Sequence, residues 1–253
     1  MAINQLLIFI KTLKMKTMTN YFSPIAKTLV CALTLTSIFS SCKKDKDVIK
    51  PPVVKPAALT LVHAAAGVAE LDFYVDKDKA NAVSFAYNTT ITDLKIAKPG
   101  KKELSVTKKG VADILVKLPV EFKEDKAYSA FVTDKTASTV VFVEDDLTAP
   151  AADKAKIRFI NLSADAGILD LAITGKAEAL IAKKDFKEFS PFIAAEPGAE
   201  INFEIRANGT ATALATLPKV KIEKGKIYTI WAKGLKAAPK DDATLGLAVM
   251  ANK

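Results

Sequence analysis

The sequence contains few of the residue types on which enzyme active sites most often depend. Among 253 residues there are two cysteines, one histidine and two arginines. Cys31 lies inside an apolar run of the kind found in export signals, and Cys42 lies directly after that run. If the signal is removed and Cys42 carries lipid, the mature fold has no thiol nucleophile, zinc–cysteine site or disulfide. Its stability must then come from a hydrophobic core.

The scarcity of arginine argues against a nucleic-acid partner. Arg158 and Arg206 are the only two arginines, and bidentate recognition of phosphate depends on that side chain. The formal net charge is +9, but residues 1–41 hold four lysines and no acid, so the remaining 33 basic and 28 acidic residues leave +5. The lysines are spread along the chain among acids, which is typical of a solvated surface.

Residues 28–41, TLVCALTLTSIFSS, form a short uncharged apolar run after Lys27. The run is too short to cross a bilayer and has the form of the hydrophobic region of a signal peptide. It ends in FSSC, which resembles a bacterial lipobox, although Phe39 stands where leucine is usual. The resemblance implies cleavage before Cys42 and lipidation of that residue. The alternative is an ordinary secretory signal, cleaved near Ser41, with an incidental cysteine.

The segments on either side of the cleavage position fit an exported, anchored protein. Residues 1–41 are predicted to be a signal peptide, and a start at Met15 would make its basic region compact. Residues 42–57 are charged and then proline-rich, which predicts an extended tether that rises about 3.1 Å per residue. Lys43 indicates the outer membrane by the sorting rule of enteric bacteria. The sequence leaves open whether the protein faces the periplasm or the surface.

Two copies of one unit follow the tether. The matching positions are Leu71-Asp72 with Leu169-Asp170, Pro99-Gly100 with Pro197-Gly198, Gly110 with Gly209, Leu118-Pro119 with Leu217-Pro218, and Tyr128 with Tyr228. Five matches in the same order, at an offset that grows slowly, are typical of a duplicated domain. We therefore predict a first repeat over 58–147, a linker over 148–156 and a second repeat over 157–253.

Each repeat has the pattern of an all-β domain. Apolar residues alternate at 71–75 and 169–173, which predicts half-buried strands. A hairpin is expected to turn at Asn208-Gly209, a pair suited to a type I′ turn. Short strands at regular spacing predict two tandem β-sandwiches of the Ig-like, Greek-key kind. Residues 152–159 and 175–186 are each expected to form at most a single turn of helix.

These residues resemble a known family. The shared features are a strand of the form (I/L)x(F/L)(I/V)(H/N), a stretch of small residues, LD followed by alternating apolar residues, a later PG, and finally Y(S/T)x(F/W). They are similar to the domain of unknown function 4397, which occurs, often in tandem, in exported bacterial proteins, including Bacteroidetes lipoproteins with an SCKKD-like tether. The resemblance covers residues 58–253, except that the usual proline before the second strand is missing. It implies a tandem β-sandwich on the cell envelope and brings no catalytic residue.

The acidic residues are interpreted as structural. Asp72 and Asp170 begin matching strands, and Glu70 beside the first has no acidic counterpart in the second repeat. A glycosidase needs two carboxylates across a cleft, so we expect the aspartates to accept backbone N–H groups from the preceding loop. The acidic stretches at 144–146 and 240–242 lack the spacing of a calcium loop. We predict no metal site, no cofactor and no catalytic residue.

Several aromatic residues are also expected to be structural. Tyr128 and Tyr228 each follow a charged turn and open an apolar strand, which is typical of the tyrosine corner of Greek-key sandwiches. Trp231 occupies the position of Phe131 and is predicted to be core. The phenylalanines of residues 186–192, FKEFSPF, are expected to pack under the sandwich or between the repeats.

The leading functional hypothesis is a non-catalytic envelope lipoprotein, a binding or adhesion module for a glycan or a protein. The alternative is a structural spacer or an assembly subunit of an envelope complex. An exported hydrolase comes third, because a chain with one histidine offers few catalytic sets. A glycan binder should expose coplanar aromatics, whereas a spacer should expose none and should have a rigid contact between its domains. Besides the membrane, reached through Cys42, the partner is left unknown.

The single histidine, His63, closes the strand LTLVH, and Asn161 closes the matching strand IRFIN. Asparagine cannot act as a general base, but both side chains offer one donor and one acceptor. The pair therefore predicts a clamp that holds a neighbouring loop. On this interpretation, His63→Asn should leave fold and function intact.

Overall fold

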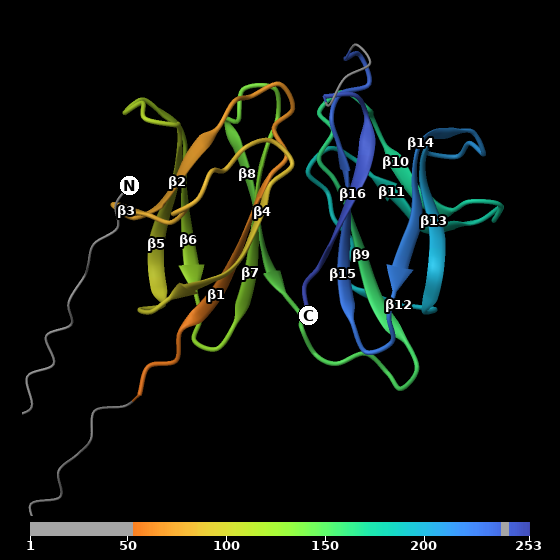
Figure 1. Ribbon diagram of the computed structural model, residues 1–253, viewed down its shortest axis with the longest axis horizontal. Coiled ribbons are helices and arrows are strands. Elements are labelled where there is room, and N and C mark those ends of the chain that lie inside the picture. The colour runs from red at the N-terminus through yellow and green to blue at the C-terminus, as the bar shows by residue number, and fades with distance from the viewer. Residues whose placement is uncertain (1–52, 239–242) are drawn as a thin grey trace, which may run out of the picture. The chain divides into compact units, whose positions relative to one another are not determined.

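The computed structural model describes residues 53–238 and 243–253, which belong to one compact unit. The predicted signal peptide, Cys42 and most of the predicted tether lie outside these residues, as does the whole acidic stretch at 240–242. The described part consists of sixteen strands in four sheets of four (Figure 1). It contains no helix, and so none that is long and apolar enough to cross a membrane. The all-β prediction is confirmed.

The first sandwich combines two four-stranded sheets. One sheet has the order β4-β1-β7-β8, and the other has the order β3-β2-β5-β6. Strands β1 and β7 run parallel, and the remaining neighbours are antiparallel. The strands are β1 (Ala57–His63), β2 (Leu71–Val75), β3 (Asp78–Lys79), β4 (Thr90–Ile96), β5 (Gly100–Lys108), β6 (Ile114–Phe122), β7 (Ala127–Thr133) and β8 (Thr139–Asp145).

The second sandwich repeats this plan. Its sheets have the orders β12-β9-β15-β16 and β11-β10-β13-β14, again with one parallel pair, β9 and β15. The strands are β9 (Ala155–Asn161), β10 (Leu169–Ile173), β11 (Ala179–Lys184), β12 (Ile193–Ala195), β13 (Gly198–Ala207), β14 (Ala213–Ile222), β15 (Ile227–Lys233) and β16 (Gly246–Ala251). Strand β9 begins inside the stretch predicted as linker. The expected helical turns are wrong, because β9 and β11 occupy those residues.

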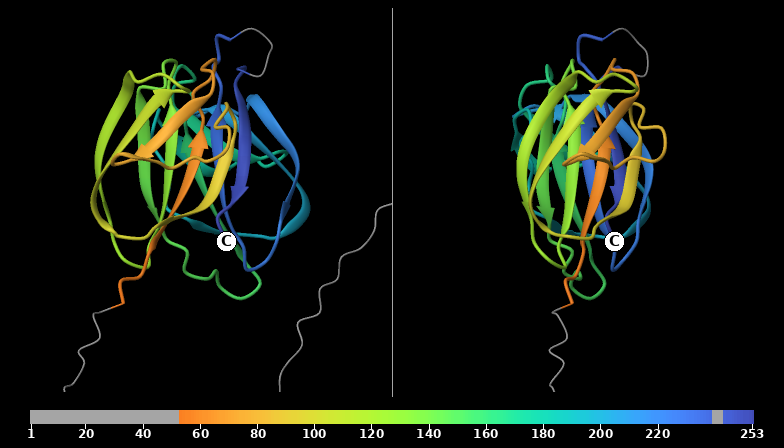
Figure 2. Two further views of the ribbon diagram at one scale, coloured as in Figure 1. Left: turned by 60° about the vertical axis from the view of Figure 1, so that its left-hand side comes forward. Right: turned by 90° about the vertical axis from the view of Figure 1, so that its left-hand side faces the viewer.

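The sandwiches are seen from two further sides in Figure 2. Each encloses its own apolar core between its two sheets. Leu59 of β1 and Phe73 of β2 belong to the first core, and Phe159 of β9 and Leu171 of β10 belong to the second. These are the alternating positions that the sequence pattern assigns to the inside. Burying apolar surface in this way is the main source of stability for a fold without disulfides.

A third buried cluster joins the two sandwiches. It consists of side chains that point away from the two cores, on strands of the β4-β1-β7-β8 and β12-β9-β15-β16 sheets and just beyond them. The buried members are Val62, Ala64, Phe131, Val141, Val143, Ile160, Leu162, Trp231 and Met250. Trp231 is buried as predicted, but it packs in this cluster, with its ring centroid 6.3 Å from that of Phe131.

The hairpin at Asn208-Gly209 differs from the predicted turn. Gly209 has a φ of 76°, but Asn208 is not among the residues with positive φ. A type I′ turn needs positive φ at both central positions, so the prediction is wrong. The loop between β13 and β14 has five residues, and the Thr210 N–H closes it on the Ala207 carbonyl (3.0 Å).

Candidate functional site

His63 and Asn161 hold equivalent loops in the two sandwiches. The Nε2 of His63 lies 3.1 Å from the Ala69 carbonyl oxygen, and its Nδ1 accepts the Ala65 N–H (3.3 Å). In the second sandwich, Asn161 Nδ2 donates to the Gly167 carbonyl (2.9 Å), and Asn161 Oδ1 accepts the N–H two residues on (3.1 Å). Both side chains are fully buried. The loop-clamp prediction is confirmed.

The electrostatics of His63 also fit a structural role. Burial lowers its pKa, and the hydrogen bonds to backbone groups offset this only in part. The ring therefore stays neutral at physiological pH, with Nε2 as donor and Nδ1 as acceptor. It faces the aromatic rings of Phe85 and Tyr87, at centroid distances of 5.4 and 6.1 Å.

Tyr128 and Tyr228 form the predicted tyrosine corners. The hydroxyl of Tyr128 accepts the Lys123 N–H (3.0 Å), and that of Tyr228 accepts the Glu223 N–H (3.1 Å). In each case the donor lies five residues upstream, in the turn before the strand. Both rings are largely buried and close the ends of their sandwiches.

Asp72 is a buried structural carboxylate. It pairs with Lys79 (Oδ1 to Nζ, 2.6 Å) and accepts the Gly110 N–H (3.1 Å). Burial acts to raise the pKa of Asp72, but these contacts outweigh it and hold the pKa below its usual value. The structural role is confirmed, whereas the expected source of the N–H is wrong: it is the β5–β6 hairpin turn and not the preceding loop.

Asp170 occupies the same place in the second sandwich. It accepts N–H groups from Lys183 (2.6 Å), the Asn208 amide (3.0 Å) and Gly209 (3.2 Å). Burial again raises and these hydrogen bonds lower its pKa, with a net downward shift. Neither aspartate can hold a proton at neutral pH, which is what a general acid requires.

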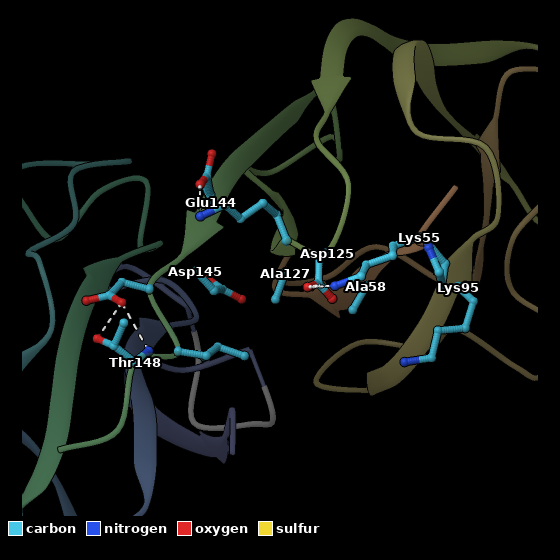
Figure 3. A pocket seen from close by; sticks show the side chains of 12 residues that line it. Lys55, Ala58, Lys95, Asp125, Ala127, Glu144, Asp145 and Thr148 are labelled. Carbon is cyan, nitrogen blue, oxygen red and sulfur yellow. Dashed lines mark hydrogen bonds and ion pairs between the residues drawn. The ribbon is translucent and has the colours of Figure 1, made fainter. Parts of the chain in front are cut away.

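A pocket of about 820 Å³ opens at the end of the first sandwich where the described chain begins (Figure 3). Its walls come from residues 55–58, from Lys95 near the end of β4, from the β6–β7 turn at 125–127, and from residues 144–148 at the end of β8 and beyond. Four separate segments therefore converge on it. This pocket is the candidate functional site.

The charged groups around the pocket are paired. Lys55 Nζ lies 2.9 Å from Asp125, in a pair whose side chains are 62% and 69% exposed (Figure 3). Glu144 lies 3.7 Å from Lys126. Asp146 accepts the hydroxyl and N–H of Thr148, which lower the pKa of its carboxyl. Thus the pocket presents both signs of charge in nearly equal measure.

The lining of the pocket offers charged, hydroxyl and apolar groups. Its residues include no histidine, cysteine, serine or aromatic side chain. The described part of the chain also holds no group of three or more residues placed to bind a metal ion. In the acidic stretch at 144–146, the three carboxylates each contact a basic or hydroxyl partner.

Asp145, at one wall of the pocket, forms a buried ion pair with Arg158 of the second sandwich. The Nη1–Oδ1 distance is 2.6 Å, and Arg158 is 1% exposed. Ser129 bridges the pair, donating to Asp145 (2.7 Å) and accepting from Arg158 (3.2 Å). Arg158 also donates to Thr229 (2.8 Å) and lies 4.6 Å from the Phe192 ring.

The sequence reasoning missed this pair. Arg158 stands at an outward position of β9, where a long basic side chain is normally solvated. The one available signal was that this arginine sits in an otherwise uncharged stretch, IRFIN. Of the phenylalanines in FKEFSPF, Phe192 contacts Arg158, whereas Phe189 is 44% exposed.

The fold and these contacts define an all-β protein of two sandwiches joined by a buried interface. A family described as domain of unknown function (DUF4397) matches residues 57–172. The match spans the first sandwich and runs on through β9 into β10. No curated protein matches the chain.

Solved structures resemble the chain only weakly. A family CBM26 module, CBMbc of Eubacterium rectale Amy13K in complex with maltoheptaose, shares 12% identity over 76% of this chain and 96% of its own, with a TM-score of 0.26. A "putative cell adhesion protein" from Parabacteroides distasonis shares 10% identity over 79% and 97% (TM-score 0.20). Another from Bacteroides ovatus shares 11% over 80% and 97% (TM-score 0.21). Similarity at this level carries no inference about a ligand.

Proposed function

We propose that the chain is a non-catalytic binding module of the bacterial cell envelope, anchored through Cys42, and that its ligand is a protein. The observation that carries the proposal is the lining of the pocket at Lys55. It combines cations, anions and apolar surface without an aromatic platform. Such a mixture is typical of the polar rim of a protein–protein interface.

The ion pairs of the pocket suit exchange with a partner. An exposed pair such as Lys55–Asp125 contributes little to stability, because water screens both charges. Replacing it by contacts to a partner's charges therefore costs little. A protein segment that carries both acidic and basic residues can satisfy both members of each pair.

A glycan is the less favoured ligand. A glycan site should present exposed, coplanar aromatic side chains. Phe189 is the one large aromatic residue among the exposed hydrophobic residues of the described chain, and it lies outside the pocket.

The test compares two charge reversals on the immobilised full chain. Lys95→Glu alters the pocket wall, and Lys117→Glu, at a similarly exposed lysine of β6, serves as the matched control. Defined envelope proteins and envelope polysaccharides are passed over each variant. We expect retention of a protein that Lys95→Glu abolishes and Lys117→Glu preserves. Retention of polysaccharide alone, unaffected by Lys95→Glu, would contradict the proposal.

The anchor is tested separately. Cys42 lies outside the described residues, so the proposal rests on the FSSC sequence. We expect palmitate labelling of the wild-type protein and none of Cys42→Ala. Undiminished labelling of the variant would disprove lipidation at this residue.

A second candidate function, a structural spacer, is favoured by the interface between the sandwiches. The Asp145–Arg158 pair and the buried cluster around Trp231 oppose bending at the linker. Spin labels on cysteines introduced at Lys117 and Lys224, in a chain without Cys31 and Cys42, would report the distance across the joint. A rigid spacer gives one narrow distance distribution, and a broad one would exclude this function.

A further inference from the structure

The second sandwich has a groove at a place that the first sandwich fills with aromatic rings. The groove, of about 320 Å³, lies between the edge strands β14 and β16. Tyr228, Val249 and Val220 are among its lining residues. It shares no lining residue with the pocket at Lys55.

The equivalent place in the first sandwich shows what such a groove accommodates. There the ring of Phe142 stacks on Tyr128, with centroids 5.1 Å apart and planes within 6°. Phe122 packs edge-on against both, at 5.0 and 5.3 Å. Together the three rings close the gap between β6 and β8.

Two substitutions remove this closure in the second sandwich. Tyr128 pairs with Glu144 on β8, and Phe142 lies two positions before Glu144. Tyr228 pairs with Ala251 on β16, and Val249 lies two positions before Ala251. Val249 is therefore the equivalent of Phe142. Six residues before each tyrosine, Phe122 is replaced by Ile222. The second sandwich therefore keeps the tyrosine and lacks both rings that cover its counterpart.

A bulge also sets the shape of the groove. Strand β14 has one residue more than β6 between its proline and the next valine: Pro218-Lys219-Val220 stands where the first sandwich has Pro119-Val120. Lys219 has a φ of 55°, which is uncommon for a residue with a side chain, and its N–H donates to the Asn202 side chain (2.8 Å). Bulges bend the strand that carries them and are frequent beside functional sites.

We propose that this groove binds an aromatic side chain of a protein partner, stacked on Tyr228 as Phe142 is stacked on Tyr128. The site is matched in size and kind to the ring that occupies its counterpart, and offset stacking of aromatic rings is a favoured geometry. Lys219 and Lys221 at the rim are already paired with Glu200 (3.6 Å) and Glu223 (2.7 Å). Recognition therefore rests on the ring and not on charge.

The neighbouring backbone indicates how the partner arrives. Strand β16, GLAVMA, ends its sheet without a charge or a proline, whereas the edge strand β14 carries Pro218. Proline and charge are the usual means of blocking an edge strand, so β16 is open to pairing with an added strand. Alternate side chains of that strand would lie on the same face as Val249 and reach the groove.

Binding is tested with a five-residue peptide that has a central phenylalanine between valines and threonines, and with the same peptide carrying leucine instead. Fluorescence anisotropy gives the affinity for the full chain, and backbone amide shifts of Val249 and Ala251 locate the site. We expect saturable binding that is at least tenfold tighter for phenylalanine than for leucine. Equal affinities would overturn the proposal.

Variants then link binding to the groove. Val249→Phe supplies the missing ring from within, so it should raise the melting temperature and weaken peptide binding at least tenfold. Deletion of Lys219 restores the spacing of the first sandwich and should also weaken binding, which keeps the test valid if Val249→Phe fails to fold. Phe142→Val in the first sandwich is the control and should leave the Val249 and Ala251 shifts unchanged.

Two results would contradict this assignment. One is a folded Val249→Phe or Lys219-deleted chain that binds the phenylalanine peptide as tightly as wild type does. The other is a concentration-dependent shift of Val249 and Ala251 without peptide, because it would show that a second copy of the chain occupies the groove.

Discussion

The two sandwiches use the same polar contacts to hold their backbones but fill their surroundings differently. Each has a clamp at the end of its first strand, a tyrosine corner and a buried aspartate that caps a hairpin. The first sandwich closes its open side with aromatic rings, whereas the second leaves a groove there. The shared contacts give hydrogen-bond partners to backbone groups that each sandwich would otherwise bury unpaired. These contacts are therefore kept in both sandwiches, although the side-chain packing around them differs.

The second sandwich also buries more charge. Glu204 and Arg206 form a buried pair (2.6 Å), at positions where the first sandwich has Ser105 and Thr107. Burial acts to raise the pKa of Glu204, but the hydrogen bonds from Arg206 and Thr174 and the charge of Arg206 together outweigh it and lower the pKa. Arg206 also donates to the Lys176 carbonyl (2.7 Å), which fixes the loop after β10. The second sandwich thus holds this loop with a buried charged side chain, at a position where the first sandwich has a threonine.

The largest effect is expected at Arg158, whose counterpart in the first sandwich is Thr60. Arg158→Met leaves Asp145 buried without its cation and should cost about 3–5 kcal/mol in the free energy of unfolding, measured in urea. Adding Asp145→Leu should restore most of the loss, because the unpaired charge is then gone. Thr60→Met, at the equivalent position, should change stability by less than about 1 kcal/mol. A similar cost for the Arg158 and Thr60 substitutions would show that the pair is not what distinguishes the sandwiches.

The next effect is expected at Phe142, the ring that closes the first sandwich. Phe142→Val should cost about 1–2 kcal/mol, because it removes apolar contacts with Tyr128 and Phe122 and leaves space behind. Urea titration of the variant beside Val249→Phe gives the comparison, since the reciprocal change should stabilise the second sandwich. If both substitutions destabilise the protein equally, the groove between β14 and β16 is packed as well as the equivalent place in the first sandwich, and the proposed difference between the sandwiches is wrong.

The tyrosine corners should respond alike. Tyr128→Phe and Tyr228→Phe each remove one hydroxyl acceptor and should each cost about 0.5–1.5 kcal/mol. Thermal unfolding of the two variants, measured side by side, checks this. A difference of more than about 1 kcal/mol between them would mean that the two corners are not equivalent.

Sequence reasoning succeeded where a feature is local and present in both repeats. The alternating strands, the clamps at His63 and Asn161 and the tyrosine corners depend on residues close together in the chain, and each copy checks the other. It failed at Asn208, because a five-residue loop removes the need for two positive φ values. It also failed on the source of the N–H that Asp72 accepts, because the hairpin that supplies it lies 38 residues further along.

The alternation of apolar and polar residues did not predict the interface between the sandwiches. Val62 and Ile160 stand at positions that alternation assigns to solvent, and only contact with the other sandwich buries them. The bulge at Lys219 can be seen in the sequence as a one-residue insertion. It borders a groove, however, only because Val249, on the strand across from it, has no aromatic ring. Such features arise from contacts between residues on separate strands, and these contacts cannot be predicted from a single sequence.

The smallest effect is expected at His63, where His63→Asn copies the clamp of the second sandwich. At pH 7 the cost should be below about 1 kcal/mol, since the asparagine keeps a donor and an acceptor and loses only ring contacts. Burial lowers the pKa of the folded histidine below 6.5, so the unfolded state binds its proton first. The wild type therefore keeps its full stability above pH 6.5 and loses part of it as the pH falls, whereas the variant lacks this loss. Urea unfolding of both proteins between pH 8 and pH 5 measures the difference, and parallel profiles would mean that the folded ring accepts a proton as readily as the unfolded one.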